Sequence, residues 1–183
     1  MTTIGYAIFG QHNDTTMLDQ CQFETCPECG YVTDFDFYNE GYRPKKEYLD
    51  YSETYDLFTV VSAKFRDFCL REAYTALRFR PFRGTNRHYC FSVDEPIVEF
   101  DSSRRETAFD KLCPTCGFYE SVTGATPVFL KKPEQLPADG FARTDLCFGS
   151  GNEKKPIYLI GAETHRKMRK ERFRGIEFIA IKI

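Results

Sequence analysis

The chain of 183 residues has no tryptophan, only three histidines, and no apolar run near the roughly 20 residues that a membrane-spanning helix needs. Its first 14 residues, MTTIGYAIFGQHND, contain neither a basic region nor a small-residue cleavage site, so a secretory signal peptide is not expected. We therefore predict a cytoplasmic protein without membrane contact. In such a reducing compartment the eight cysteines stay free to bind metal.

Catalytic motifs are missing as well. The sequence contains no GxSxG, HExxH, GxGxxG or zinc-deaminase HxE…PCxxC pattern. The glycine-rich stretch Phe148–Gly151 lacks the Gly-Lys-Ser/Thr ending of a P-loop, so it is predicted to be an ordinary loop. Because no nucleophile is accompanied by a base, we expect a protein that is not an enzyme.

The most informative feature that is present is a repeated cysteine motif. Residues 26–30 and 113–117 both read CPxCG. The proline fixes φ at the first intervening position, and the glycine tolerates the positive φ that turns backbone N–H groups toward the sulfurs. Two such pairs supply four thiolates, the closed tetrahedral set of a structural zinc site. The predicted zinc ligands are Cys26, Cys29, Cys113 and Cys116.

Three alternatives to a single zinc site remain open. A thioredoxin-like redox pair needs a helix after it, whereas aromatic segments of alternating character follow both motifs. Disulfides need an oxidising compartment. Two separate ions are the third alternative, because 83 residues lie between Cys29 and Cys113, more than in an ordinary zinc ribbon. None of the histidines, however, lies at ligand spacing from a CxxC pair.

The remaining cysteines have simpler interpretations. Cys21 lies five positions before Cys26 and is a candidate spare ligand. Cys69, Cys90 and Cys147 lie in apolar helix-like or strand-like segments, so we predict that they are core residues.

A second repeat relates Leu57–Phe82 to Tyr158–Ile181, with an offset of 99 positions. Each copy reads as an apolar strand, a small residue, a helix of about ten to twelve residues and a short alternating strand. The predicted fold is an α+β protein with a mainly antiparallel sheet. It forms a single compact domain of two related strand–helix–strand halves, about 1–100 and 101–183, each with one CPxCG knuckle.

Details of the repeat can be predicted too. Ser62 is suited to cap the first helix, and either Gly161 or Thr164 starts the second. The alternating strands should turn four apolar side chains inward. These are Leu77, Phe79, Ile176 and Phe178.

Charge is distributed unevenly along the chain. Residues 1–60 hold eleven acids and three bases, a formal charge of −8, which leaves +6 for residues 61–183. The stretch 34–56 mixes acids with tyrosines, a composition typical of interface hot spots, although an ordinary exposed meander is the alternative. The candidate partner-binding residues are Tyr48, Asp50, Tyr51, Glu53, Tyr55 and Asp56.

The combination of these motifs resembles the double-CXXCG-motif immunity proteins known from myxobacteria and other bacteria. The resemblance covers most of the chain. It is carried by the two CPxCG motifs and by VVSAKFRDF (60–68), ALRFRPF (76–82), ARTDLCFGSG (142–151) and GIEFIAI (175–181). It implies a small protein that binds and neutralises a cognate toxin, without an activity of its own. The first unit departs from the pattern by carrying Ala76 where the second has Gly175.

Another class of function is also compatible with a zinc site. The basic segment HRKMRKERFR (165–174) beside zinc knuckles is typical of zinc-ribbon-type nucleic-acid-binding proteins. The pI near 6.0 and the acidic first third oppose this alternative, so we do not expect nucleic acid to be the main partner.

Overall fold

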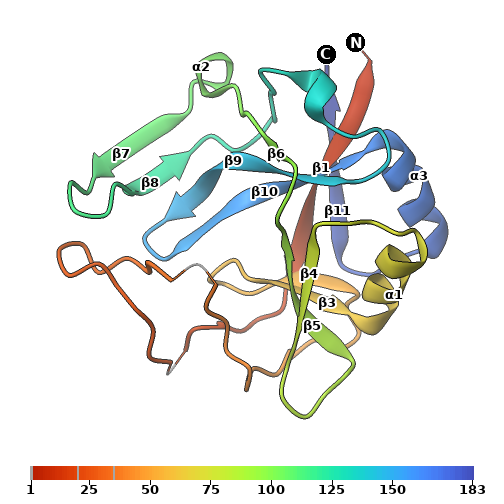
Figure 1. The fold of residues 1–183 in the computed structure, drawn as a ribbon, viewed down its shortest axis with the longest axis horizontal. Coiled ribbons are helices and arrows are strands. Elements are labelled where there is room, and N and C mark those ends of the chain that lie inside the picture. The colour runs from red at the N-terminus through yellow and green to blue at the C-terminus, as the bar shows by residue number, and fades with distance from the viewer. Residues whose placement is uncertain (1, 20, 35) are drawn as a thin grey trace.

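The computed structural model describes residues 2–19, 21–34 and 36–183, and the fold is shown in Figure 1. The strands are β1 (Thr3–His12), β2 (Tyr51–Glu53), β3 (Thr59–Ser62), β4 (Leu77–Pro81), β5 (His88–Val93), β6 (Ile97–Val98), β7 (Ala108–Leu112), β8 (Tyr119–Thr123), β9 (Phe141–Ser150), β10 (Glu153–Gly161) and β11 (Ile176–Lys182). The helices are α1 (Ala63–Arg71), α2 (Ser102–Arg105) and α3 (Ala162–Glu171), with a short 3-10 turn at Pro133–Gln135.

All the strands belong to one 11-stranded sheet. Its order is β4-β5-β3-β2-β1-β10-β9-β8-β7, with β11 paired to β1 and β6 paired to β9. Only β1–β2 and β6–β9 pair in parallel among the described strands. The predicted mixed class with mainly antiparallel pairing is therefore confirmed.

The two strand–helix–strand segments have the same local topology. β5 lies between β3 and β4 and is antiparallel to both, so the strands that α1 connects run parallel with one strand between them. In the same way, β1 lies between β10 and β11, which α3 connects. The two units differ in the origin of the middle strand: β5 follows β4 directly, whereas β1 comes from residues 3–12. Strand β1, at the start of the chain, thus pairs with both strands that flank α3.

Backbone conformation repeats at equivalent positions of the two units. Ala73 and Arg172, 99 positions apart, end the helical segments with φ of 56° and 55°. Ala76 and Gly175 then both adopt positive φ, 57° and 85°. An added Cβ at Gly175 would lie 2.5 Å from the carbonyl oxygen of Tyr51, so close packing as well as positive φ requires glycine there.

The two helices begin differently. The Ser62 hydroxyl accepts a hydrogen bond from the Phe65 N–H at 3.2 Å, which confirms the predicted cap of α1. Gly161 precedes α3, and no side chain caps that helix. A Cβ on Gly161 would lie 2.1 Å from the carbonyl oxygens of Pro137 and Ala138, so the close approach of that loop selects glycine.

Aromatic packing joins the two units. Phe65 of α1 is fully buried, with ring centroids 5.4 Å from Phe91 and 5.3 Å from Phe173, which follows α3. The four alternating strand residues predicted to point inward are half-buried and pack against this same cluster. A second cluster lies between the strands around β9 and the loop after β8, and includes Val98, Phe100 and Leu159.

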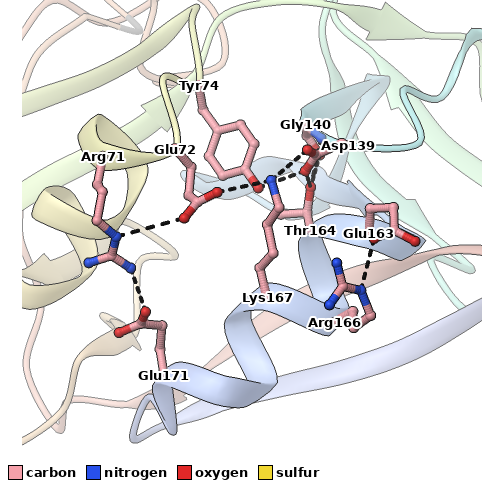
Figure 2. A network of polar contacts seen from close by, with 10 residues as sticks. All are labelled: Arg71, Glu72, Tyr74, Asp139, Gly140, Glu163, Thr164, Arg166, Lys167 and Glu171. Carbon is pink, nitrogen blue, oxygen red and sulfur yellow. Dashed lines mark hydrogen bonds and ion pairs between the residues drawn. The ribbon is translucent and has the colours of Figure 1, made fainter.

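A polar network ties α1 to α3, which lie side by side (Figures 1 and 2). Arg71 pairs with Glu171, and Lys167 pairs with Glu72 at 2.9 Å and with Asp139 at 2.6 Å. Burial alone would raise the pKa of the Asp139 carboxyl group, but hydrogen bonds from Lys167, Tyr74 and Thr164 outweigh it and lower this pKa.

Candidate metal centre

The two CPxCG motifs converge, although they lie far apart in the sequence. The Sγ atoms of Cys26 and Cys113 are 3.9 Å apart, and those of Cys29 and Cys116 are 3.6 Å apart. All four sulfurs lie within 4.8 Å of one another. A tetrahedral zinc with Zn–S bonds of about 2.3 Å requires sulfur–sulfur distances of about 3.8 Å. The four side chains therefore have the chemistry and the spacing to hold one such ion.

The two knuckles share one backbone conformation. The N–H of Gly30 donates to the Cys26 carbonyl at 2.8 Å, and the N–H of Gly117 donates to the Cys113 carbonyl at 2.9 Å. The glycines have φ of +74° and +73°, and nothing lies within 4 Å of an added Cβ at either. Glycine is therefore selected here by its backbone freedom and not by crowding.

The knuckles differ in what supports them. The second forms the turn of the β7–β8 hairpin, and β8 also pairs with β9 of the main sheet. The first lies between β1 and β2. The residues on either side of it pair through an isolated β-bridge between Thr25 and Val32. Figure 1 shows the two turns next to each other, at the end of the molecule away from α3.

Side chains of the β9–β10 region help to hold the first knuckle. The Val32 N–H donates to Asn152 Oδ1 at 2.9 Å, and Lys154 Nζ lies 4.3 Å from the centroid of the Tyr31 ring. Across the site, Thr115 donates a hydrogen bond to Glu28. Sequence reasoning missed Asn152 and Lys154, because their distance from the motif in the sequence gave no signal of contact.

Burial and hydrogen bonding shift the pKa values of thiols in this cluster. Cys26 and Cys113 are buried, with 3% and 6% exposed, and Cys29 and Cys116 are half-buried. Hydrogen bonds from the backbone N–H groups of Cys29 and Glu28 lower the pKa of Cys26 to about 7. Loss of hydration raises the pKa of Cys29. All four coordination positions would be filled by sulfur, so a bound ion would have no open position for substrate.

The other cysteines lie outside this cluster. Cys69 and Cys90 are buried, as predicted, and burial raises the pKa of Cys90 to about 11. Cys147 is half-buried on β9. The Cys21 thiol contacts the backbone oxygens of Met17 and Asp19 at 3.9 and 3.6 Å and is not among the four converging sulfurs.

The predicted partner-binding residues are not all on the surface. Tyr48 and Tyr55 are 58% and 48% exposed. Tyr51, Glu53 and Asp56 are buried, so they do not form part of an exposed acidic face.

The carboxylates of this stretch have internal partners. Glu53 pairs with Lys155 and accepts from the Gly10 N–H at 2.9 Å. Asp56 accepts hydrogen bonds from the N–H groups of Met17 and Leu18. Asp50 accepts from the Ser62 hydroxyl at 2.8 Å and from the Arg174 N–H at 2.9 Å. Composition alone did not distinguish these structural acids from surface acids.

Comparison of this chain with family models, with curated proteins and with solved structures found no match. Within the described part of the chain, no helix is both long and apolar enough to cross a membrane. A functional proposal therefore depends on the residues and the geometry described above.

Proposed function

We propose that this protein is an immunity protein that binds and neutralises a cognate toxin in the cytoplasm, and that one structural zinc ion joins its two knuckles. The convergence of two CPxCG pairs separated by 83 residues carries the metal part of the proposal. The resemblance of the motifs to the double-CXXCG-motif immunity proteins carries the toxin part. The proposed zinc ligands are Cys26, Cys29, Cys113 and Cys116.

Zinc suits this site for chemical reasons. Four thiolates form a soft, closed ligand set, which favours zinc over oxygen-preferring cations such as magnesium or calcium. The ion would neutralise half of the formal charge of four thiolates that otherwise repel one another. Because every ligand position is a protein sulfur, the role of the ion is structural, in keeping with a protein that acts by binding and not by turnover.

The toxin-binding surface is proposed to include the exposed rings of Tyr48 and Tyr55. Tyrosine at an interface provides a large contact area at low entropy cost. Tyr48 lies in the loop just before β2, and Tyr55 lies just after β2. Tyr51, Glu53 and Asp56 are buried, so the proposed surface does not include them. It therefore contains fewer residues than the interface predicted from composition.

Co-expression tests this function. A toxin encoded beside this gene should kill cells on its own and spare them when this protein is present. The Tyr48→Ala/Tyr55→Ala double variant should bind the purified toxin more weakly, mainly through faster dissociation, measured by surface plasmon resonance. Arg166→Gln, on the exposed face of α3, is the matched control. Cell death that is unchanged by co-expression would refute the immunity function.

One observation favours the alternative of nucleic-acid binding. The end of α3 and the turn after it present exposed cations without an ion pair among the described residues, namely Arg169, Lys170, Arg172 and Arg174. If this patch binds phosphates, affinity for labelled RNA or DNA should fall steeply with salt, and Arg172→Gln should reduce that salt dependence. Affinity that does not change with salt would eliminate this alternative.

A further inference from the structure

Strand β11 pairs with a neighbouring strand on one side only. Its partner is β1, in an antiparallel register that runs from Gly10 opposite Ile176 to Gly5 opposite Ile181. Among the described strands, no other one pairs with β11. The seven residues of β11 therefore present a row of backbone N–H and C=O groups that no described strand uses.

The register identifies the outward backbone groups. The Gln11 N–H donates to the Gly175 carbonyl at 2.7 Å, and residues of an antiparallel strand alternate between bonding toward one partner and away from it. Every second residue after Gly175 thus bonds to β1, and the residues between them direct their N–H and C=O groups to the free edge. These outward residues are Ile176, Phe178, Ala180 and Lys182.

The other strands that pair on one side only, β4, β6 and β7, have features that hinder the addition of a strand. β4 contains Pro81, which has no N–H, and the Tyr38 hydroxyl donates to its carbonyl oxygen at 3.2 Å. β7 is interrupted at Lys111, which has φ of 46° and follows the charged Asp110. β6 has only two residues. β11 has neither a proline nor a positive φ, so it is the edge best suited to accept another strand.

Cations lie along the α3 side of this edge. Phe178 of β11 packs on His165 of α3, with ring centroids 4.7 Å apart. Arg169 lies one helical turn after His165 and therefore on the same side of α3. Lys182 is on the same face of β11 as Phe178, because side chains alternate along a strand. A strand added at this edge would meet positive charge on its α3 face.

The opposite face of β11 is apolar. Ile179 and Ile181 lie on it and pack in the second apolar cluster. Glu177, the one acidic residue of β11, is on this face as well, because it is an even number of residues from both isoleucines. An acidic side chain of an added strand would therefore be repelled on this face and attracted on the α3 face.

Cations outnumber acids around β11. Residues 169–182 hold five Lys or Arg residues and two Glu residues, a formal charge of +3. Two neighbouring carboxylates already have partners, since Glu171 pairs with Arg71 and Asp50 pairs with Lys64 at 3.7 Å. The exposed cations that form no ion pair among the described residues are Arg169, Lys170, Arg172, Arg174 and Lys182.

A second copy of this chain is a poor match for the edge. Two β11 strands paired about a two-fold axis run antiparallel, so Lys182 of each copy lies near the end that carries Arg172 and Arg174 in the other. Like charges opposite one another destabilise a strand pair. The charge pattern instead favours a strand that carries acids.

We propose that the free edge of β11 binds an extended strand of another protein, in which acidic residues on the α3 side alternate with apolar residues on the opposite side. Hydrogen bonds to the outward backbone groups supply affinity, and the cations select the acidic partner and its register. The proposal depends neither on the metal site nor on toxin neutralisation.

Labelled synthetic peptides test the proposal. A short peptide of alternating glutamate and valine should bind the native metal-loaded protein saturably, with one site per chain, in a fluorescence anisotropy titration. The same peptide with lysine in place of glutamate is the matched control for charge, and we expect it to bind at least about tenfold more weakly. Hydrogen exchange of the amides in residues 176–182 should slow when the glutamate peptide is bound.

Backbone methylation distinguishes strand pairing from simple charge attraction. Adjacent residues of a strand direct their N–H groups to opposite edges. A peptide methylated at the glutamate nitrogens and one methylated at the valine nitrogens therefore each keep one edge intact. One of the two should lose at least about tenfold in affinity, and the other should bind nearly as well as the parent peptide. Pairing antiparallel to β11 predicts that methylation at glutamate is the damaging one.

Substitutions locate the site on the protein. Ala180→Pro removes one outward N–H, which β1 does not use, and should weaken binding of the glutamate peptide by about tenfold. Arg174→Gln should weaken it by about threefold and reduce its dependence on salt. Arg166→Gln, which removes a cation paired with Glu163, should have no effect. The unfolding midpoint of each variant, measured without peptide, shows whether it has folded.

Four results would overturn the proposal. They are no saturable binding of the glutamate peptide, equal binding of the lysine peptide, equal effects of the two methylations, and a dimer of the free protein that Ala180→Pro dissociates. Equal effects of methylation would indicate a general polyanion site of the kind that RNA occupies, and the dimer would assign the edge to a second copy. If Ala180→Pro does not fold, the two methylated peptides still decide the outcome on the wild-type protein.

Discussion

The two CPxCG knuckles are almost identical in backbone conformation and very different in their surroundings. The second is the turn of a regular hairpin that is hydrogen-bonded to the main sheet. The first lies in residues 13–50, whose described part contains no strand or helix beyond an isolated bridge. The same local conformation is therefore reached with and without regular supporting structure. Local hydrogen bonds and the positive φ of the glycine are enough to form the motif. Its position relative to the sheet depends on contacts with other parts of the chain.

The long first segment is anchored mainly at its base. Asp56 accepts hydrogen bonds from the backbone of Met17 and Leu18, and Tyr42 is buried against Phe82 with ring centroids 5.1 Å apart. Near the knuckle tip, the described polar contacts to the rest of the chain are few and include the bond from Val32 to Asn152. A shared metal ion would supply the link that regular structure supplies to the second knuckle.

Loss of the metal should have the largest effect, and it should separate the two knuckles. Cys113→Ser should abolish zinc binding and lower the melting temperature strongly, since thiolate–zinc binding contributes on the order of 10 kcal/mol in small zinc modules. Hydrogen exchange should then accelerate much more in residues 21–34 than in residues 108–123. Elemental analysis and exchange mass spectrometry measure both effects.

Cys147→Ser is the control for that experiment, because Cys147 is half-buried and lies outside the cluster. Equal loss of protection in both segments would show that the hairpin does not stabilise the second knuckle. Protein purified without chelators that contains no metal would contradict the zinc site, and two ions per chain would show separate sites.

The equivalent helix positions 65 and 164 offer a second comparison. Phe65 packs among aromatic rings, whereas the fully buried Thr164 accepts a hydrogen bond from the Gly140 N–H at 2.6 Å. Phe65→Ala should cost about 3–5 kcal/mol through the cavity it leaves. Thr164→Val should cost about 1–3 kcal/mol, because it leaves the partly buried Gly140 N–H without its hydroxyl acceptor.

Urea unfolding measures both free energies. The conservative variant Thr164→Ser, which keeps the hydroxyl group, should lose less stability than Thr164→Val. If the valine variant is as stable as wild type, the polar network of Figure 2 contributes little to holding α3.

The same network should make stability depend on pH at the acidic end. The pKa of Asp139 is lowered in the folded state, so its contribution is fully present above the unfolded-state pKa and is lost as pH falls through the lowered value. Asp139→Asn should therefore lower the melting temperature near pH 6, by the equivalent of about 1 kcal/mol. The difference from wild type should disappear near about pH 2. A difference that is constant with pH would contradict this role for the carboxylate.

The smallest change in stability is expected for substitution of Ala76, which is compared here with substitution of Gly175. Both have positive φ, but only the glycine is crowded by Tyr51 and Leu49. Ala76→Gly should change stability by less than about 1 kcal/mol, since relief of backbone strain opposes the greater entropy of the unfolded chain. Gly175→Ala should destabilise by clearly more. Similar effects of both substitutions, measured by thermal unfolding, would show that crowding at Gly175 is relieved by small shifts.

The sequence predicted local features better than long-range ones. The mixed class, the Ser62 cap and the positive φ after the second cysteine follow from residue types over a few positions, and the structure contains all of them. The placement of β1 beside β11 depends on pairing between distant segments, which periodicity does not encode. The burial of Glu53 was missed for the same reason, because its partner Lys155 lies 102 positions away.

The position of β1 has a consequence for how the chain folds during synthesis. Residues 3–12 pair with strands that span residues 153–182, so on the ribosome this segment stays without its main partners until almost all of the described chain has emerged. The unit of β3, α1, β4 and β5 has no such delay, since its strands are neighbours in the sequence. An early strand with exposed backbone edges is a natural binding site for chaperones. We expect the unit around α1 to form first and the nascent β1 to be the segment most in need of protection.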